Sequence, residues 1–298
     1  MLDDNIDKNH ILFAGLFSVF VLLFFLIKNI FFYKDFFVVC DVGQGDAIYL
    51  RLSKKDVLLD SGPSREVLYC LGKNMPFWDK KIELVIITHP HKDHYGGLDY
   101  VLNYYQVERV VLPAVVNLEA KSYISLLEDL DSSKVELVDM QKGERIDIGK
   151  DFSLRFYWPD SEYLKRNLRD VVFKINDFSL YSTDQDLNDF SYVLSLDFQD
   201  NIFAVFTGDI SSMVLGEIYQ DIKGYKKPTF FKYPHHGSVR SLNKEVFNSL
   251  ETESILISVG KKNPYGHPSP AVLRFLEEQG KNIITTSEAG NIKIFIRR

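Results

Sequence analysis

The chain has very few cysteines, two among 298 residues, at positions 40 and 70. Their spacing matches neither the closely paired cysteines of a zinc motif nor the dense cysteine pattern of a disulfide-stapled domain. Cys40 also lies in an apolar, strand-like run, and unpaired buried cysteines behave as small hydrophobic side chains. We therefore expect Cys40 and Cys70 to be ordinary core residues without a redox role.

The chain also lacks an excess of positive charge, because 35 Lys and Arg face 41 Asp and Glu and the formal net charge is -6. A protein that coats nucleic acid by bulk electrostatics needs the opposite balance in order to neutralise phosphates. That class is excluded, although a local basic rim is not. Disorder is excluded as well, since 46% of the residues are hydrophobic and the length suffices for a buried core.

A long uncharged run is present near the N-terminus, at residues 11–27, and apolar residues resume after Lys28. Together they reach the ~20 residues that a tilted helix needs to cross a bilayer. We predict an N-terminal flank at 1–10, a single transmembrane anchor at 11–33 and a folded domain at 36–298. A cleaved secretory signal is the main alternative, but the run has no basic start and no Ala-x-Ala pattern after it. A buried soluble helix fits less well, because the run is apolar on every face.

Beyond residue 35, apolar strand-like segments alternate with helical ones, which is typical of a layered α/β domain. One helix is expected at 93–105, directly after a strand at 82–87. Polar motifs follow the ends of the expected strands, so we infer a single domain whose loops converge on one edge. These motifs are Asp41-Val42-Gly43-Gln44-Gly45-Asp46-Ala47, Leu59-Asp60-Ser61-Gly62, Thr207-Gly208-Asp209, Pro234-His235-His236-Gly237-Ser238 and Tyr265-Gly266-His267-Pro268.

The most informative motif is a histidine cluster that follows the apolar run at 82–87 and holds three of the seven histidines of the chain. His89 and His91 are two apart in an extended segment and project to the same side, while Asp93 and His94 lie where a helix begins. Each pair can hold one ion, because imidazole and carboxylate are common metal ligands. The pattern therefore predicts a metal site, and a polar loop without a ligand is the alternative.

The form His-x-His-x-Asp-His at 89–94 resembles the metal motif of the metallo-β-lactamase superfamily, whose members are binuclear metallo-hydrolases. The polar motifs given above further resemble the hydrolase domain of ComEC-type competence proteins, from about Phe36 to the C-terminus. The resemblance implies an αββα four-layer sandwich of two mixed β-sheets, preceded here by the transmembrane helix. The polytopic channel region of those proteins has no counterpart in this sequence, so DNA translocation by this chain alone is not expected.

Carried over position by position, the resemblance assigns His89 and His91 to a first metal ion and Asp93 and His94 to a second. It makes Asp209 the bridge between the two ions. One carboxylate shared between two dications offsets their repulsion, which gives this assignment a chemical reason. The alternative for Asp209 is a helix N-cap, since two serines and a helical run follow it.

The last ligand stays open between two histidines. In the related phosphorylcholine esterases the second histidine of a His-His-Gly motif serves the second metal, which favours His236. Other branches of the superfamily use a late histidine, which here would be His267.

The first metal position lacks one expected ligand, because no histidine occurs between positions 94 and 235. Asn188 or Ser191 stands near the place of the histidine that the superfamily usually has there. We expect two divalent ions, with one-metal occupancy as the alternative. Imidazole and carboxylate ligands suit Zn2+ or Mn2+, and no cysteine ligand favours zinc alone.

The resemblance and the ligand chemistry together predict a metal-dependent phosphodiesterase, and we expect a nuclease that acts on DNA. In the expected reaction a metal-bound hydroxide attacks phosphorus. His235 or His267 stabilises the developing charge or protonates the leaving oxygen, and Asp93 takes part through its metal. Residues expected to bind substrate or to orient the ligands are Gln44, Asp46, Asp60, Asn188 and Ser238. We also expect four solvated surface charges that could contact the phosphate backbone of a DNA strand, and these are Lys232, Arg240, Lys261 and Lys262.

Two other functions stay open. One is hydrolysis of phosphorylcholine or another cell-envelope phosphodiester, which the acidic charge and the anchor fit. The other is a non-catalytic DNA-uptake or scaffold module tied to a membrane partner. Expected partners are accordingly DNA or another phosphodiester, the lipid bilayer and membrane DNA-uptake proteins. The charges around the run favour a cytoplasmic domain, whereas the resemblance implies an extracytoplasmic one, and we adopt the latter.

Overall fold

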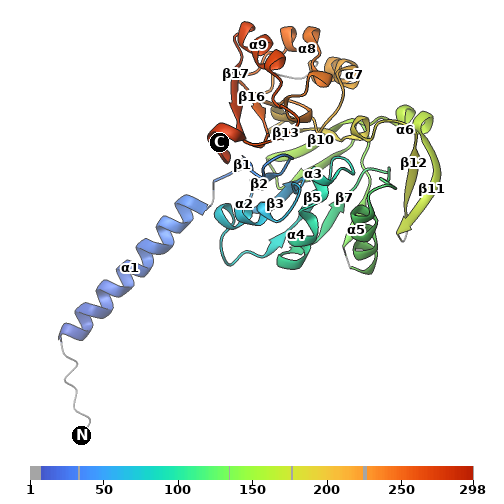
Figure 1. Cartoon of the computed structure of the whole chain (residues 1–298). Helices are drawn as coiled ribbons and strands as arrows, with labels where there is room; N and C mark the ends of the chain where they lie inside the picture. Colours follow the sequence, from blue (N-terminus) through green and yellow to red (C-terminus); the bar gives the residue numbers. More distant parts are fainter. Residues whose placement is uncertain (1–7, 33, 134, 176, 224–226, 298) are drawn as a thin grey trace.

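A computed structural model describes residues 8–32, 34–133, 135–175, 177–223 and 227–297 (Figure 1). Seven strands form a first mixed sheet, in which β18, β1, β2 and β3 pair antiparallel and β3, β5, β7 and β8 pair parallel. In spatial order they are β18 (Ile292–Phe295), β1 (Phe36–Val39), β2 (Ile48–Leu52), β3 (Lys55–Leu59), β5 (Leu84–Ile86), β7 (Arg109–Val111) and β8 (Glu136–Val138).

A second mixed sheet is built mainly from the C-terminal half. Its strands β14 to β17 run parallel, and β14, β13, β10 and β9 pair antiparallel. In spatial order they are β17 (Asn282–Thr285), β16 (Ser254–Ile257), β15 (Phe230–Lys232), β14 (Asn201–Phe206), β13 (Val193–Phe198), β10 (Phe152–Trp158) and β9 (Arg145–Ile148). The short strands β4 (Lys81–Ile82) and β6 (Gln106–Val107) pair separately.

Three apolar layers hold the domain together. Inward-facing side chains of both sheets, such as Phe37 and Phe206, fill the space between the sheets. One outer layer lies between the first sheet and the helices α2 (Glu66–Asn74), α3 (Lys92–Tyr95), α4 (Leu98–Tyr104) and α5 (Lys121–Ser132). The other lies between the second sheet and α6 (Ser161–Asn167), α7 (Ser212–Lys223), α8 (Lys244–Ser249) and α9 (Pro270–Glu278). Helices therefore cover both outer faces, and the predicted αββα sandwich is confirmed (Figure 1).

The helix predicted at 93–105 is interrupted, and the reason is close backbone packing at its glycines. Helix α3 ends before Gly96, and α4 begins after Gly97. A Cβ on Gly97 would lie 2.1 Å from the backbone oxygen of Ser61, so only glycine lets these two segments approach. The short helix α3 before this break carries two of the predicted metal ligands, Asp93 and His94.

The segment between 158 and 192 contains structure that the sequence did not predict. Helix α6 is followed by a hairpin of β11 (Leu168–Ile175) and β12 (Phe178–Thr183), beside the 3-10 helix Leu187–Phe190. Most side chains of β11 face solvent, and Val171 is 52% exposed. A strand whose side chains mostly face solvent gives only a weak periodic apolar pattern, which explains the omission.

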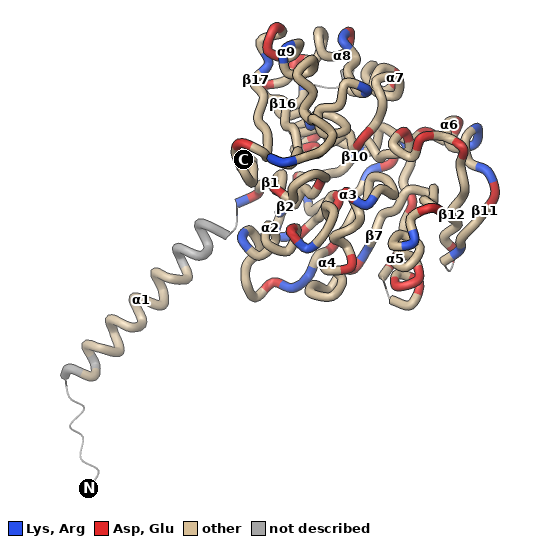
Figure 2. Tube along the Cα trace, in the orientation of Figure 1, with Lys and Arg blue, Asp and Glu red and all other residues tan. Residues whose placement is uncertain are grey.

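Helix α1 (Lys8–Phe32) extends away from the domain (Figure 1), and Figure 2 draws its coloured part without Lys, Arg, Asp or Glu. Its large apolar side chains between Leu12 and Phe25 are exposed. Within the described part of the chain, no helix has the length and hydropathy needed to cross a membrane. The predicted flank up to residue 7, and the last residue of the predicted anchor at 33, lie outside the described residues.

The two cysteines form a disulfide, so the expectation of unpaired core cysteines is wrong. Cys40 directly follows β1 and Cys70 lies in α2, and packing of this helix against the first sheet brings their Cα atoms to 5.8 Å. Both residues are buried. The pair is separated by 30 residues, which is why spacing alone did not indicate it. Cys40 immediately precedes the Asp41–Asp46 loop, so the bond fixes one end of a loop that reaches the candidate site.

Candidate metal centre

The polar motifs meet where the carboxyl ends of neighbouring strands from both sheets come together. The histidine cluster follows β5 in the first sheet, while Asp209 follows β14 and His236 follows β15 in the second. Carboxyl ends of parallel strands share one edge of a sheet, and ligands of α/β proteins commonly bind there. The strand order therefore gathers side chains that are far apart in the sequence.

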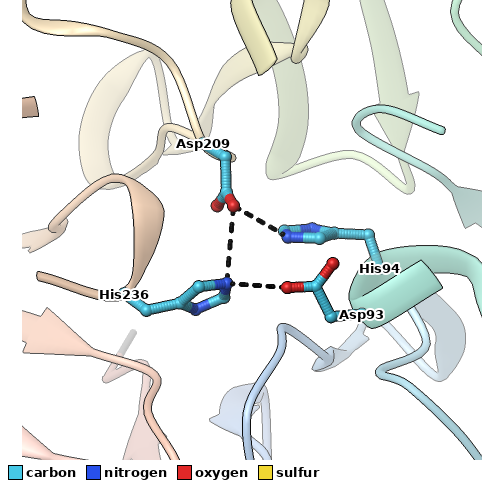
Figure 3. Close-up of side chains that lie close together, drawn as sticks. All are labelled: Asp93, His94, Asp209 and His236. Atoms are coloured by element: carbon cyan, nitrogen blue, oxygen red, sulfur yellow. Dashed lines mark ion pairs between the residues drawn. The ribbon is translucent and has the colours of Figure 1, made fainter. Parts of the chain in front are cut away.

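Four of the predicted ligands form one compact group, drawn in Figure 3: Asp93, His94, Asp209 and His236. Their ligand atoms all lie within 4.8 Å of one another. Oδ2 of Asp209 is 3.3 Å from Nε2 of His94 and 3.4 Å from Nε2 of His236. Oδ2 of Asp93 is 3.3 Å from the same Nε2 of His236. Asp209 therefore faces both imidazoles at once, as a bridging carboxylate would.

The buried atoms of this group fit a divalent cation. Nε2 of His94, Nε2 of His236 and Oδ1 of Asp209 are buried without a hydrogen-bond partner in the structure. Such atoms are costly unless something completes their bonding. A cation between two imidazole nitrogens and two carboxylates would do so, and this donor set suits Zn2+ or Mn2+.

Hydrogen bonds on the far side of each ring direct Nε2 toward the group. Nδ1 of His94 lies 2.8 Å from Oδ2 of Asp60, whose carboxylate accepts bonds from the backbone and hydroxyl of Thr88. Nδ1 of His236 lies 2.9 Å from the backbone oxygen of Ser258, which can only accept. Nδ1 of His236 therefore carries a proton, and Nε2 is the atom that faces a metal once its own proton has left.

The first predicted metal position is less complete. Nε2 of His89 lies 3.0 Å from Nδ1 of His91, so two ring nitrogens face each other as a pair of ligands would. The amide oxygen of Asn188 is 3.0 Å from Nδ1 of His91, near the place of the absent histidine. Among the described residues, His89 and His91 join no group of three or more ligands. This position thus has two imidazoles and one neutral amide.

Two further histidines, His235 and His267, lie beside the group. Nε2 of His235 is 4.0 Å from Oδ2 of Asp209, and its side chain is 23% exposed. The ring of His267 lies 5.9 Å from that of His235 and stacks against Tyr265 on its other side. In the described structure His267 is not part of the four-residue group, whereas His236 is. Their roles stay predictions.

The other predicted site residues make local contacts. Oε1 of Gln44 accepts a long bond from the backbone of Gly260 at 3.4 Å, so it ties the β1–β2 loop to the second sheet. Ser238 is buried and its hydroxyl accepts from the backbone of Arg240 at 3.3 Å, which makes it a turn residue. Through this contact Ser238 caps the N-terminus of the 3-10 helix Val239–Ser241. Asp46 lies behind His236, as described below.

Lys232 does not lie at the surface. It is only 1% exposed, and its Nζ is 2.5 Å from Oδ2 of Asp46. The expectation of solvated charge is therefore wrong for Lys232, while Arg240 and the Lys261–Lys262 pair are exposed as expected. The signal in the sequence is its position in Phe230-Phe231-Lys232-Tyr233, an apolar strand in which a lone lysine must find a buried partner.

Three residues at the centre have a strained backbone conformation. Asp60, His235 and His236 all have positive φ, at 56°, 51° and 54°. Residues with a Cβ rarely adopt this left-handed conformation, and each costs of the order of 1–3 kcal/mol. The consecutive pair turns the chain sharply after β15, so His236 is buried while the side chain of His235 is 23% exposed. Strained residues of this kind cluster at functional sites.

Burial and nearby carboxylates set the protonation of the histidines in opposite ways. Burial lowers the pKa of His89, His235 and His267, so these rings are neutral near pH 7. Burial acts in the same direction on His94 and His236, but two carboxylates together outweigh it at each ring, Asp209 with Asp60 at His94 and Asp209 with Asp46 at His236, and raise the pKa of both well above the ordinary value. In the metal-free protein, protons therefore occupy the positions that a cation would take.

Metal affinity is expected to fall as the pH is lowered, because the protons on His94 and His236 must leave before a cation binds. The apparent dissociation constant should rise about tenfold per pH unit for each proton released. Competition with a chromophoric chelator at about pH 8 and at about pH 6, roughly one unit on either side of neutrality, measures this change in the dissociation constant. Calorimetry in two buffers of different ionisation enthalpy counts the protons. An affinity independent of pH would contradict the assignment of these rings as ligands.

Comparisons with known proteins agree with the geometry. A family model described as the metallo-beta-lactamase superfamily matches residues 40–176. ComE operon protein 3 of Bacillus subtilis is 26% identical over 274 residues, covering 85% of this chain and 32% of that protein. Recombination protein 2 of Haemophilus influenzae is 22% identical over 258 residues, covering 85% of this chain and 28% of that protein. The chain thus spans about a third of the length of these curated relatives.

Solved structures share the fold at low sequence identity. The metallo-beta-lactamase fold protein YhfI of Bacillus subtilis is 11% identical, with a TM-score of 0.55 and coverage of 88% of this chain and 100% of that one. Zn2+-bound PqqB of Methylobacterium extorquens is 9% identical, with a TM-score of 0.55 and coverage of 87% and 100%. The matched motif region, the two-sheet fold and the group of candidate metal ligands agree, and residues 40–176 therefore belong to a metallo-beta-lactamase superfamily domain, in a chain that is similar over 85% of its length to ComE operon protein 3.

Proposed function

We propose that this domain is a metal-dependent phosphodiesterase that cuts DNA. The observation that carries the proposal is the group of Asp93, His94, Asp209 and His236, in which His94, Asp209 and His236 are buried and each has a ligand atom without a hydrogen-bond partner among the described residues. Divalent ions held there would activate water near neutral pH and stabilise charge on a phosphoryl oxygen. Hydrolysis of a phosphodiester needs both of these contributions.

The residues at the opening complete the chemistry. His235 is neutral near pH 7 and its Nε2 lies 4.0 Å from Oδ2 of Asp209, so its ring N–H can donate a hydrogen bond to the charge that develops on an oxygen beside the group. The ring of His267 lies beside that of His235, and we expect it to contact the same substrate. The exposed Arg240, Lys261 and Lys262 can contact phosphates on either side of the scissile bond.

DNA is favoured over a cell-envelope phosphodiester by the relatives and by the rim of the site. Two curated relatives bear the names ComE operon protein 3 and recombination protein 2, and the second name points to DNA. Beside His267, the ring of Tyr265 is exposed and nearly parallel to the imidazole, with an interplanar angle of 15°. An exposed aromatic ring near a phosphate-cleaving group is a suitable surface for a nucleobase.

Turnover of matched substrates tests the proposed function. The purified protein, loaded with Mn2+ or Zn2+, should cleave single-stranded DNA and bis-nitrophenyl phosphate and should lose both activities on chelation. A phosphorylcholine ester should be the poorer substrate. Preference for that ester would establish the envelope alternative, and absence of turnover on every substrate by metal-loaded protein would leave the non-catalytic DNA-uptake module.

Replacing Tyr265 with alanine is expected to lower kcat/KM for single-stranded DNA by about tenfold or more, because base stacking on an aromatic ring contributes ~1–3 kcal/mol. Hydrolysis of bis-nitrophenyl phosphate should stay within about twofold, since that substrate has no base to place there. The matched variant Tyr265→Phe keeps the ring and should behave as the parent protein on both substrates. Equal losses on both substrates in Tyr265→Ala would contradict a base-binding role.

We also propose that α1 attaches the domain to the lipid bilayer on its extracytoplasmic side, where membrane DNA-uptake proteins are its partners. The exposed apolar side chains of α1 support attachment, because such side chains are unfavourable in water. The Cys40–Cys70 disulfide supports the outer side, since disulfides persist mainly in oxidising compartments. Protease added to intact cells should digest the domain. Full protection, with digestion only after lysis, would place the domain in the cytoplasm.

A further inference from the structure

A buried ion pair joins the two sheets directly behind the candidate metal centre. Lys232 ends β15 in the second sheet, and Asp46 ends the β1–β2 loop in the first. Both side chains are 1% exposed, and Nζ lies 2.5 Å from Oδ2 of Asp46. Taking both charges out of water costs free energy, so the burial of this pair requires an explanation in terms of what the two side chains contact.

Asp46 contacts two of the candidate ligands from behind. Its Oδ1 lies 3.4 Å from Nδ1 of His236, and its Oδ2 lies 4.0 Å from Nδ1 of His94. Both contacts are on the side of the ring opposite to the Nε2 atoms that face Asp209. These Nδ1 atoms already bond Asp60 and the backbone oxygen of Ser258, so the negative charge of Asp46 acts beside those bonds, where it holds the Nδ1 protons in place and strengthens both rings as ligands.

Lys232 contacts the backbone segments that carry the other ligands. Its Nζ donates to the backbone oxygen of Gly208 at 3.3 Å, one residue before Asp209. It also donates to the backbone oxygen of Tyr233 at 3.4 Å, at the start of the turn that leads to His236. One ammonium group therefore links the two segments that carry Asp209 and His236 and supplies a positive charge beside Asp46.

We propose that Lys232 and Asp46 are a positioning pair that assembles the metal centre across the two sheets. Asp46 orients His236 and His94, while Lys232 balances the charge of Asp46 and sets the distance between the sheets at this point. Neither residue touches the substrate. This inference rests on the proposed metal centre, but it assigns a role to residues that hold the ligands rather than the metal.

Metal affinity in single and double variants tests the pair. Lys232→Met leaves the Asp46 carboxylate buried without its cation, and Asp46→Asn leaves the ammonium aimed at the centre. Each variant should weaken Zn2+ or Mn2+ binding by about 10–100-fold, the range known for partners that orient metal ligands. Lys232→Met/Asp46→Asn has no unbalanced charge and should bind more tightly than the product of the two single losses predicts. Chelator competition gives the affinities, and the visible absorption of the Co2+-substituted protein reports ligand geometry.

The buried pair of Arg51 and Asp56 provides a matched control. Nη1 of Arg51 is 2.6 Å from Oδ2 of Asp56, and both side chains are buried, at the opposite end of β3 from Asp60. Arg51→Met should lower thermal stability but leave metal affinity and the Co2+ spectrum unchanged. If Lys232→Met does not fold, Asp46→Asn and its Co2+ spectrum decide the question alone.

The outcomes separate this inference from the proposed function. Parent protein that binds no divalent metal would overturn both. Parent protein that binds metal, with variants that bind it equally well and show an unaltered Co2+ spectrum, would overturn only the positioning role. Losses of affinity that multiply in the double variant would also overturn it, because Lys232 and Asp46 would then act separately.

Discussion

Asp209→Asn is expected to reduce metal-dependent phosphodiester hydrolysis by about 10³-fold, a loss typical of removing a group that stabilises transition-state charge. Oδ2 of Asp209 lies 3.3 Å from His94 and 3.4 Å from His236, so one carboxylate oxygen serves both rings. An amide removes the negative charge between two candidate cation positions and can place an NH2 group there. Initial rates with saturating Mn2+ and metal content per chain measure the effect.

Asp209→Asn is expected to lose at least one bound metal ion per chain as well as activity. The loss of metal distinguishes a ligand role from a structural one. Asp184→Asn is the matched control, because Asp184 is 77% exposed and pairs with Arg169 at the hairpin, away from the centre. The control should keep both metal content and rate. If Asp209→Asn keeps full metal content and turnover while remaining folded, Asp209 is a helix cap and the bridging assignment is wrong.

The sequence predicted the architecture of the site well, for a physical reason. Apolar runs that end in polar motifs mark strands whose carboxyl ends meet at one edge, and the Thr88–Gly97 cluster and the Thr-Gly-Asp motif at 207–209 both follow this rule. Local pattern therefore indicated which residues face the edge. It did not indicate that Asp209 and His94 come within 3.3 Å of each other. That assignment came from the resemblance, which carries information about how the sheets pack.

Interactions between segments that pack only in the folded domain were not predictable. Lys232 pairs with Asp46 across the two sheets, and nothing near either residue in the sequence indicates the other. Cys40 and Cys70 are likewise joined by the packing of α2 on the first sheet. In each case the sequence signal was a residue type unusual for its surroundings. A lysine in a buried strand indicates that a partner exists, but it does not identify the partner.

Removing the Cys40–Cys70 disulfide is expected to lower the free energy of unfolding by about 3 to 4 kcal/mol, because the bond closes a loop with a sequence separation of 30 residues in the unfolded chain. Urea denaturation of Cys40→Ala/Cys70→Ala, beside the oxidised parent, measures the loss, and alanine avoids burying a new hydroxyl group. Reduced parent protein should match the variant, and adding reductant to the variant should change nothing. The bond holds the start of the Asp41–Asp46 loop, so metal affinity should fall together with stability. Equal unfolding free energies for oxidised and reduced parent protein would contradict a stabilising role and would remove the support that the bond gives to an extracytoplasmic location.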